Sequence, residues 1–118
     1  MATLTPTLTL TSSDVTSDSL ALTATDSLTV SGDVISPSRV ATTTGDLTLL
    51  AAATYGPSYV YLKNTDSSIV INVDFGSTLS LKLSAGEFAF FPWEGSQNVV
   101  VAAASGTPVL EYALFEAA

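Results

Sequence analysis

The stretch from Tyr59 to Glu116 reads YVYLKNTDSSIVINVDFGSTLSLKLSAGEFAFFPWEGSQNVVVAAASGTPVLEYALFE. Short runs of β-branched, leucine and aromatic residues alternate in it with breaks made of Gly, Pro, Asn and Ser. Strand signals spaced about 8 to 12 residues apart are typical of an antiparallel sandwich or barrel. No apolar run of useful length has the helical period. The stretch therefore predicts an all-β fold, which we take to be an antiparallel β-sandwich.

Six segments of this stretch are predicted as strands, and turn residues bound each of them. They are Tyr59–Lys63, Ile69–Asp74, Leu79–Leu83, Glu87–Phe91, Asn98–Ala103 and Val109–Glu116. The turn before the fourth segment contains Gly86, where a positive φ is expected. The only runs that a helix could use, Leu47–Thr54 and the alanines at 102–104, are short and flanked by β-branched residues, so at most one helical turn is expected there.

Residues 3–11 read TLTPTLTLT, an alternation of period two. In a strand this alternation places Leu4, Leu8 and Leu10 on one face and the threonines on the other. Pro6 favours an edge strand or an extended arm, because proline has no N–H to donate to a central ladder. These three leucines are candidate interface residues.

A hairpin is predicted to follow, with a Ser- and Asp-rich turn over Ser12–Ser19 and a returning strand over Leu20–Thr25. Further turns are predicted at Ser31-Gly32-Asp33 and at Pro37-Ser38. We therefore expect several short strands in the first half of the chain.

The length of 118 residues suits one domain with a modest core. We expect a single β-sandwich domain over residues 1–118, with residues 1–11 as an N-terminal arm that reaches a neighbouring molecule. Hydrophobic residues make up 47% of the chain and charged residues 12%, a balance that favours folding over disorder.

The formal charge of −8 comes from eleven carboxylates against three cations, Arg39, Lys63 and Lys82. Binding to nucleic acid or to anionic lipid depends on clustered Lys and Arg, so neither is expected. The longest apolar run, Val99–Ala104, is far shorter than the roughly 20 residues that span a bilayer. The N-terminus also lacks the basic and apolar regions of a secretory signal, so export by that route is not expected.

The chain has no His and no Cys, which removes imidazole catalysis, disulfides and thiolate metal sites. Serine is abundant, but no Gly-x-Ser-x-Gly motif accompanies it. Asp14, Asp18, Asp26 and Asp33 do not have the spacing of a calcium loop, so turn formation and solubility are their expected roles. We expect no enzyme activity, no cofactor and no metal site.

The segment Leu83–Trp93 combines the end of a strand, a Gly-Glu turn and five aromatic or proline residues. Aromatic residues in such a hairpin normally enter the core. The alternative is that Phe91 and Trp93 lie at one end of the sandwich and contact a neighbour, since aromatic residues often anchor interfaces. Both are therefore kept as candidate interface residues.

The motifs Tyr61-Leu62-Lys63-Asn64, Ile69–Val73, Ala85-Gly86-Glu87 and Leu110-Glu111-Tyr112-Ala113-Leu114 resemble those of the head decoration, or cement, proteins of tailed bacteriophages. The resemblance covers residues 59–116, about half of the chain. It implies a jelly-roll-like domain, a homotrimer, a place in the virion on the capsid exterior, and the major capsid protein as partner. It brings no catalytic residues with it.

Other functions are compatible with the sequence. A carbohydrate-binding module would use Tyr55, Tyr59 or Trp93 as stacking platforms, and a tail or spike accessory protein would share the same fold and composition. The turn at Glu87 also resembles the second half of a cupin barrel, but a cupin metal site needs histidines. The threonine row in residues 3–11 resembles an ice-binding surface, although ordinary strand alternation explains it.

Overall fold

The computed structural model of the chain describes residues 2–117, and every regular element in that range is a β-strand. No helix in this range has the length and apolar character needed to cross a membrane. The predicted all-β fold is confirmed. The strands belong to two compact units, one that extends to Ser31 and one that spans Gly32–Ala117.

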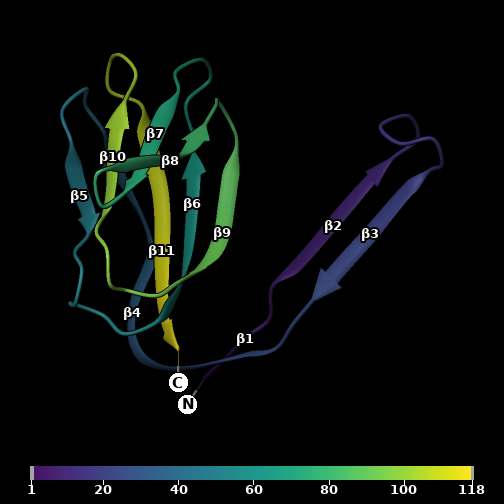
Figure 1. Cartoon of the computed structure of the whole chain (residues 1–118), viewed down its shortest axis with the longest axis horizontal. Coiled ribbons are helices and arrows are strands. Elements are labelled where there is room, and N and C mark those ends of the chain that lie inside the picture. The colour runs from purple at the N-terminus through teal and green to yellow at the C-terminus, as the bar shows by residue number, and fades with distance from the viewer. Residues whose placement is uncertain (1, 118) are drawn as a thin grey trace. The chain divides into compact units, whose positions relative to one another are not determined.

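The first unit is a two-stranded antiparallel ribbon, seen in Figure 1 as the β2–β3 hairpin. Its strands are β1 (Ala2–Leu4), β2 (Thr7–Ser12), β3 (Leu20–Thr25) and the first residues of β4 (Leu28–Ala41). Leu10 pairs with Leu22 in the hairpin, and Leu4 pairs with Leu28 beyond it in the same register. The predicted hairpin is confirmed, and its second strand, β3, lies outside the residues 1–11 expected to form the arm.

A short break interrupts the ribbon between β1 and β2, because Pro6 cannot donate to the ladder. The Pro6 carbonyl still accepts a hydrogen bond from the Asp26 amide at 3.3 Å, so the two chains keep their register across the break. At the other end, the Ser12 hydroxyl accepts hydrogen bonds from the Asp14 and Val15 amides at 3.3 and 3.2 Å. This is the local turn chemistry expected of a serine that ends a strand.

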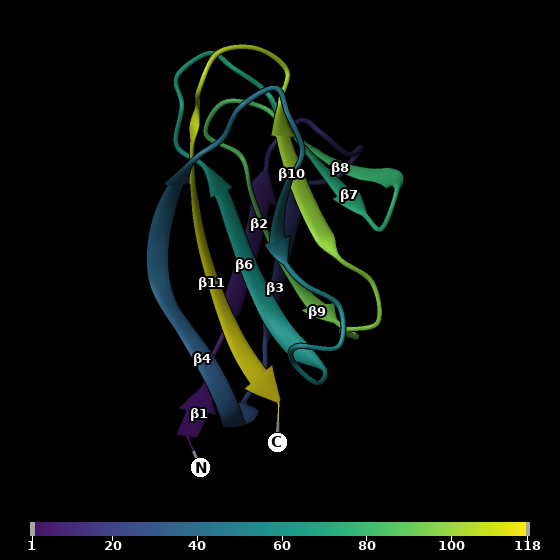
Figure 2. The same cartoon turned by 90° about the vertical axis from the view of Figure 1, so that its left-hand side faces the viewer.

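The second unit is a sandwich of two antiparallel sheets (Figures 1 and 2). Besides β4, its strands are β5 (Leu47–Leu50), β6 (Ser58–Asn64), β7 (Ile71–Phe75), β8 (Thr78–Leu83), β9 (Phe88–Trp93), β10 (Val99–Ala103) and β11 (Val109–Ala117). One sheet has the order β4-β11-β6-β9 and the other β5-β10-β7-β8. Most connections therefore cross from one sheet to the other, and this wiring of eight strands is that of a jelly roll.

All six strands predicted in the second half are present, with shifts of one or two residues at most of their ends. The turns predicted at Ser31-Gly32-Asp33 and Pro37-Ser38 are wrong, because β4 runs through both without interruption. On its other side β4 is paired with β1 only at residues 28–30, so the rest of β4 forms an edge of the sheet. An edge strand tolerates Pro37, whose missing N–H is not needed there.

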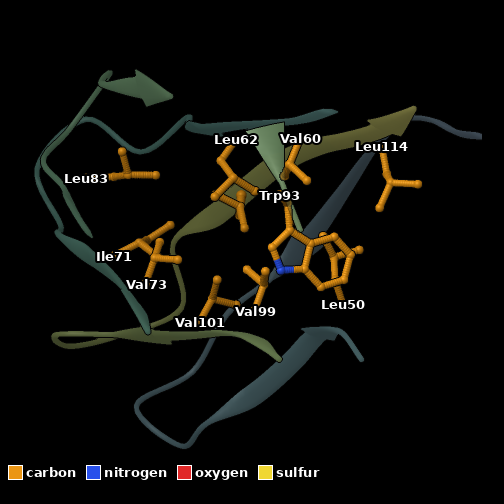
Figure 3. Packing of buried hydrophobic residues seen from close by; sticks show 11 residues of the cluster. Leu50, Val60, Leu62, Ile71, Val73, Leu83, Trp93, Val99, Val101 and Leu114 are labelled. Carbon is orange, nitrogen blue, oxygen red and sulfur yellow. The ribbon is translucent and has the colours of Figure 1, made fainter. Parts of the chain in front are cut away.

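The core lies between the two sheets and receives side chains from every strand of the second unit, with β4 contributing only the half-buried Ile35 and Val40. Its buried members are Leu50, Val60, Leu62, Ile71, Val73, Leu83, Trp93, Val99, Val101, Leu110 and Leu114. Figure 3 shows the Trp93 indole pointing into this cluster between Val60 and Val99. Within residues 2–117 no buried side-chain nitrogen or oxygen lacks a hydrogen-bond partner. The core of the sandwich is thus filled by apolar side chains, and the buried polar side-chain atoms around it are hydrogen-bonded.

Candidate interaction surfaces

The ribbon has two chemically distinct faces. Residues that pair across an antiparallel ladder point to the same face, and successive residues point to opposite faces. The pairs Leu8–Ala24, Leu10–Leu22 and Ser12–Leu20 therefore share one face. The alternate pairs, Thr7–Thr25, Thr9–Thr23 and Thr11–Ala21, share the other.

The leucine face of the ribbon is uncovered. The exposed fractions are 45% for Leu8, 42% for Leu10 and 52% for Leu22, while Leu20 is half-buried. We call these four residues the leucine stripe. Single exposed leucines need no explanation, but four on one face of a two-stranded ribbon form a contiguous apolar surface.

The opposite face of the ribbon carries five threonines and Ala21, all of them exposed. Thr25 and Thr7 approach each other across the ladder, with their hydroxyl oxygens 3.4 Å apart. Hydroxyl-rich faces of this kind remain compatible with water, so the ribbon is amphipathic with a single apolar side.

The second candidate surface lies on the outer face of the β4-β11-β6-β9 sheet. Val60 and Leu62 of β6 point into the core, so Tyr59, Tyr61 and Lys63 point outward. The register places Pro92 and Phe115 beside Tyr59, Phe90 and Ala113 beside Tyr61, and Phe88 and Glu111 beside Lys63. The outer side of this sheet therefore carries three rows of side chains with five aromatic rings among them.

We call Tyr59, Tyr61, Phe88, Phe90 and Phe115 the aromatic face. Phe88 and Phe90 have exposed fractions of 59% and 39%, and the other three rings are half-buried. The rings of Tyr59 and Phe90 stack with centroids 6.3 Å apart and planes inclined by 17°. An aromatic cluster of this kind on the outside of a sandwich is a candidate binding surface, since the core is already filled by other residues.

Polar groups flank the aromatic face at its Lys63 end. The Tyr61 hydroxyl donates a hydrogen bond to the Glu111 carboxylate at 3.0 Å, and Arg39 Nε lies 3.4 Å from the other oxygen of that carboxylate. Burial, together with the hydrogen bond to Glu111, raises the pKa of the Tyr61 phenol above its usual value of 10.0. Tyr61 is therefore a neutral hydrogen-bond donor at neutral pH, and Arg39 and Lys63 supply the positive charge of this end.

The predicted interface residues occupy different environments. Leu8 and Leu10 belong to the leucine stripe, whereas Leu4 pairs with Leu28 and is half-buried. Phe91 packs against the core with its ring centroid 5.5 Å from that of Phe75. Trp93 is only 7% exposed, and its indole N–H donates to the Gln97 carbonyl at 3.1 Å. Trp93 therefore serves the core and offers no stacking platform to a ligand.

Sequence reasoning missed the two exposed phenylalanines, Phe88 and Phe90. A signal for them exists in the adjacent pair Phe90-Phe91, because neighbouring residues of a strand point to opposite faces. When aromatic residues occupy both odd- and even-numbered positions of one strand, they line both faces of the sheet. Leu20 and Leu22 were also missed as surface residues, although their pairing with the first strand of the hairpin brings them beside the predicted leucines.

Among residues 2–117 no three Asp, Glu, His or Cys side chains lie close enough to hold a metal ion. A shallow hollow of about 350 Å³ lies beside Phe75, Phe91 and the loop of residues 92–97, and it is open to solvent.

Comparison of the sequence with protein-family models and with curated proteins finds no match. Within residues 2–117 we take the leucine stripe and the aromatic face as the candidate sites, because both are exposed apolar surfaces.

Proposed function

We propose that the chain is a virion structural protein: a capsid decoration, or cement, protein that assembles as a homotrimer and binds the outside of a tailed-phage head. The observation that carries the proposal is the uncovered leucine stripe. An isolated two-stranded ribbon is marginally stable in water, so a ribbon with an exposed apolar face is suited to a permanent partner. The resemblance of four motifs to those of cement proteins and the jelly-roll wiring support the same function, although a fold alone does not establish one.

The proposed mechanism is mechanical. Each bound copy bridges adjacent subunits of the major capsid protein and opposes the outward pressure of packaged DNA. The free energy of attachment comes from burial of apolar side chains and from strand pairing at exposed sheet edges. With few charges on its surface, the chain loses little free energy to desolvation when neighbours cover it.

The test is attachment of the purified chain to undecorated capsids, measured by co-sedimentation and by resistance of the capsid to heat. We expect saturable attachment and a higher temperature of DNA release. Deleting residues 2–11 removes β1 and all of β2 except Ser12, which leaves β3 almost without a partner strand, so this deletion should weaken attachment while the sandwich stays folded. The proposal would be contradicted if the full chain did not sediment with capsids. Undiminished attachment of the deletion variant would show that residues 2–11 are not needed for attachment.

A carbohydrate-binding module is the second candidate, and the aromatic face is the observation that favours it. Exposed rings beside hydrogen-bonding groups such as Tyr61 and Arg39 are suited to stacking on sugars. The test is a glycan array with the full chain, followed by titration of the Tyr59→Ala variant against any hit. Binding that Tyr59→Ala abolishes without unfolding the chain would favour this function over capsid attachment. A third candidate, a tail or spike accessory protein, would be distinguished from both by labelling the chain and locating it on the phage particle.

A further inference from the structure

Two apolar surfaces of this chain are exposed, the leucine stripe of the ribbon and the aromatic face of the sandwich. We propose that they bind each other between copies, so that the leucine stripe of one copy packs on the aromatic face of a second copy. The inference rests on the homo-oligomer of the proposed function and identifies the surfaces that would form it. The proposed contact between copies can form without the capsid.

The two surfaces match in spacing. Each is one face of an antiparallel ladder, so its side chains stand in rows two residues apart, about 6.8 Å along the strand. The stripe has three rows, Leu8–Ala24, Leu10–Leu22 and Ser12–Leu20. The aromatic face also has three rows, which contain Tyr59, Tyr61 and Lys63 of β6. Leucines can therefore lie in the gaps between successive rows of rings, as side chains do when two sheets pack in a sandwich.

The two surfaces also match in charge. The only charged residues in the ribbon are Asp14, Asp18 and Asp26, two in the turn at its tip and one at the break. The end of the aromatic face carries Lys63 and the Arg39–Glu111 pair, and so holds two of the three cations of a chain whose formal charge is −8. Charge complementarity therefore favours docking of the ribbon of one copy on the aromatic face of another.

Packing of ribbon on ribbon is the competing arrangement within a homo-oligomer, and charge disfavours it. If two or three ribbons packed together, the only charged side chains brought close to one another would be aspartates. The ribbon has no Lys or Arg to offset their repulsion. On the aromatic face, by contrast, an acidic end of the ribbon can lie beside Lys63.

Cysteine cross-linking tests the pairing directly, because the natural chain has no cysteine. The variants Leu10→Cys and Phe90→Cys are purified separately, mixed at equal concentration and oxidised. We expect the mixed disulfide between the two variants to form in excess over either homodimer. Thr9→Cys, which lies on the opposite face of the ribbon next to Leu10, is the matched control and should give little mixed product with Phe90→Cys.

Solution mass provides the second measurement. Replacing Leu10 and Leu22 with Thr keeps strand propensity but removes apolar area, and each lost leucine should weaken association about tenfold or more. The paired control, Thr9→Ala with Thr23→Ala, alters the opposite face in the neighbouring row and should leave the mass unchanged. Circular dichroism establishes that both variants keep the β fold.

Each other outcome would overturn the inference. Predominant Leu10→Cys homodimers would mean that ribbons pack on one another, and a disulfide confined within a Leu10→Cys/Phe90→Cys double variant would mean docking within one chain. A strict monomer, or a glycan that binds Phe90 and blocks the cross-link, would also overturn it. A monomer that still sediments with capsids would overturn the inference and the homotrimer but would support capsid attachment. A cross-linked oligomer that does not bind capsids would support the inference and contradict capsid attachment.

Discussion

Asn64 is the residue on which the loops at one end of the sandwich depend. It is fully buried, and its side-chain amide donates to the carbonyls of Ile69 and Leu83 at 2.7 and 2.9 Å. Its side-chain oxygen accepts from the Asp66 amide at 3.0 Å. One side chain thus joins the end of β6 to the loop before β7 and to the end of β8. This accounts physically for an asparagine at the end of the Leu-Lys-Asn motif.

Asn64→Ala should lower the free energy of unfolding by about 2–4 kcal/mol, because it leaves two carbonyls and one amide without partners in a dry environment. Urea unfolding measures this loss. Asn72 is the matched control, since it lies half-buried on β7 and its replacement by Ala should cost less than about 1 kcal/mol. Equal losses for the two variants would show that the hydrogen bonds of Asn64 are not the cause.

Asp66 gives the stability a defined pH dependence. Hydrogen bonds from the Ser68 and Ile69 amides, at 2.9 and 2.8 Å, lower the pKa of this carboxyl below its usual 3.8. Its contribution is therefore present above pH 3.8 and is lost as the pH falls through the lowered folded-state pKa. The stability difference between the natural chain and Asp66→Asn should narrow between about pH 5 and pH 2, as measured by urea unfolding. A difference that stays constant or widens toward low pH would contradict this.

At the scale of elements, the connection from β8 to β9 shows how a turn is set by local chemistry. Gly86 has a φ of +79°, as its place in the turn predicts, and its amide donates to the Asn64 carbonyl at 3.0 Å. The Glu87 carboxylate accepts from the Ser84 amide at 2.6 Å across the same turn. The Ala-Gly-Glu motif therefore directs β9 back beside β6, and this pairing brings Phe88 and Phe90 onto the aromatic face.

Gly86→Ala should destabilise the sandwich by about 1–2 kcal/mol, the cost of an L residue in the left-handed region. No atom lies within 4 Å of the added methyl group, so the backbone alone would cause the loss. The comparison is Gly45→Ala, whose φ is not positive and whose new Cβ would meet only the Thr43 hydroxyl at 3.7 Å. We expect Gly45→Ala to be neutral or slightly stabilising in thermal unfolding. A similar loss for both variants would argue against the backbone explanation.

At the scale of the whole molecule, the chain combines a closed jelly roll with a ribbon that has almost no core of its own. The central strands of the sandwich are buried on the inner face and paired on both sides, whereas nearly every residue of β2 and β3 is exposed. Local stability follows the number of buried apolar contacts, so it must differ strongly between the two units. The ribbon is therefore the part of the molecule whose order depends most on a partner.

Hydrogen exchange should reveal this difference. In a dilute, dissociated sample, amides of Thr7–Ser12 and Leu20–Thr25 should exchange at least about tenfold faster than those of Val99–Ala103. Assembly at high concentration should slow exchange in the ribbon and leave the sandwich unchanged. Equal protection of both units in the dissociated chain would mean that the ribbon is stable without a partner.

The sequence by itself determined the class of fold, the hairpin of the ribbon and the turn at Gly86. These features depend on alternation and turn chemistry, which act between residues close together in the chain. Only the tertiary structure decided that Trp93 faces the core while Phe90 faces outward, and that Arg39, Tyr61 and Glu111 meet. Those placements depend on which distant strands pair and in what register, and a shift of one residue would exchange the two faces of a strand.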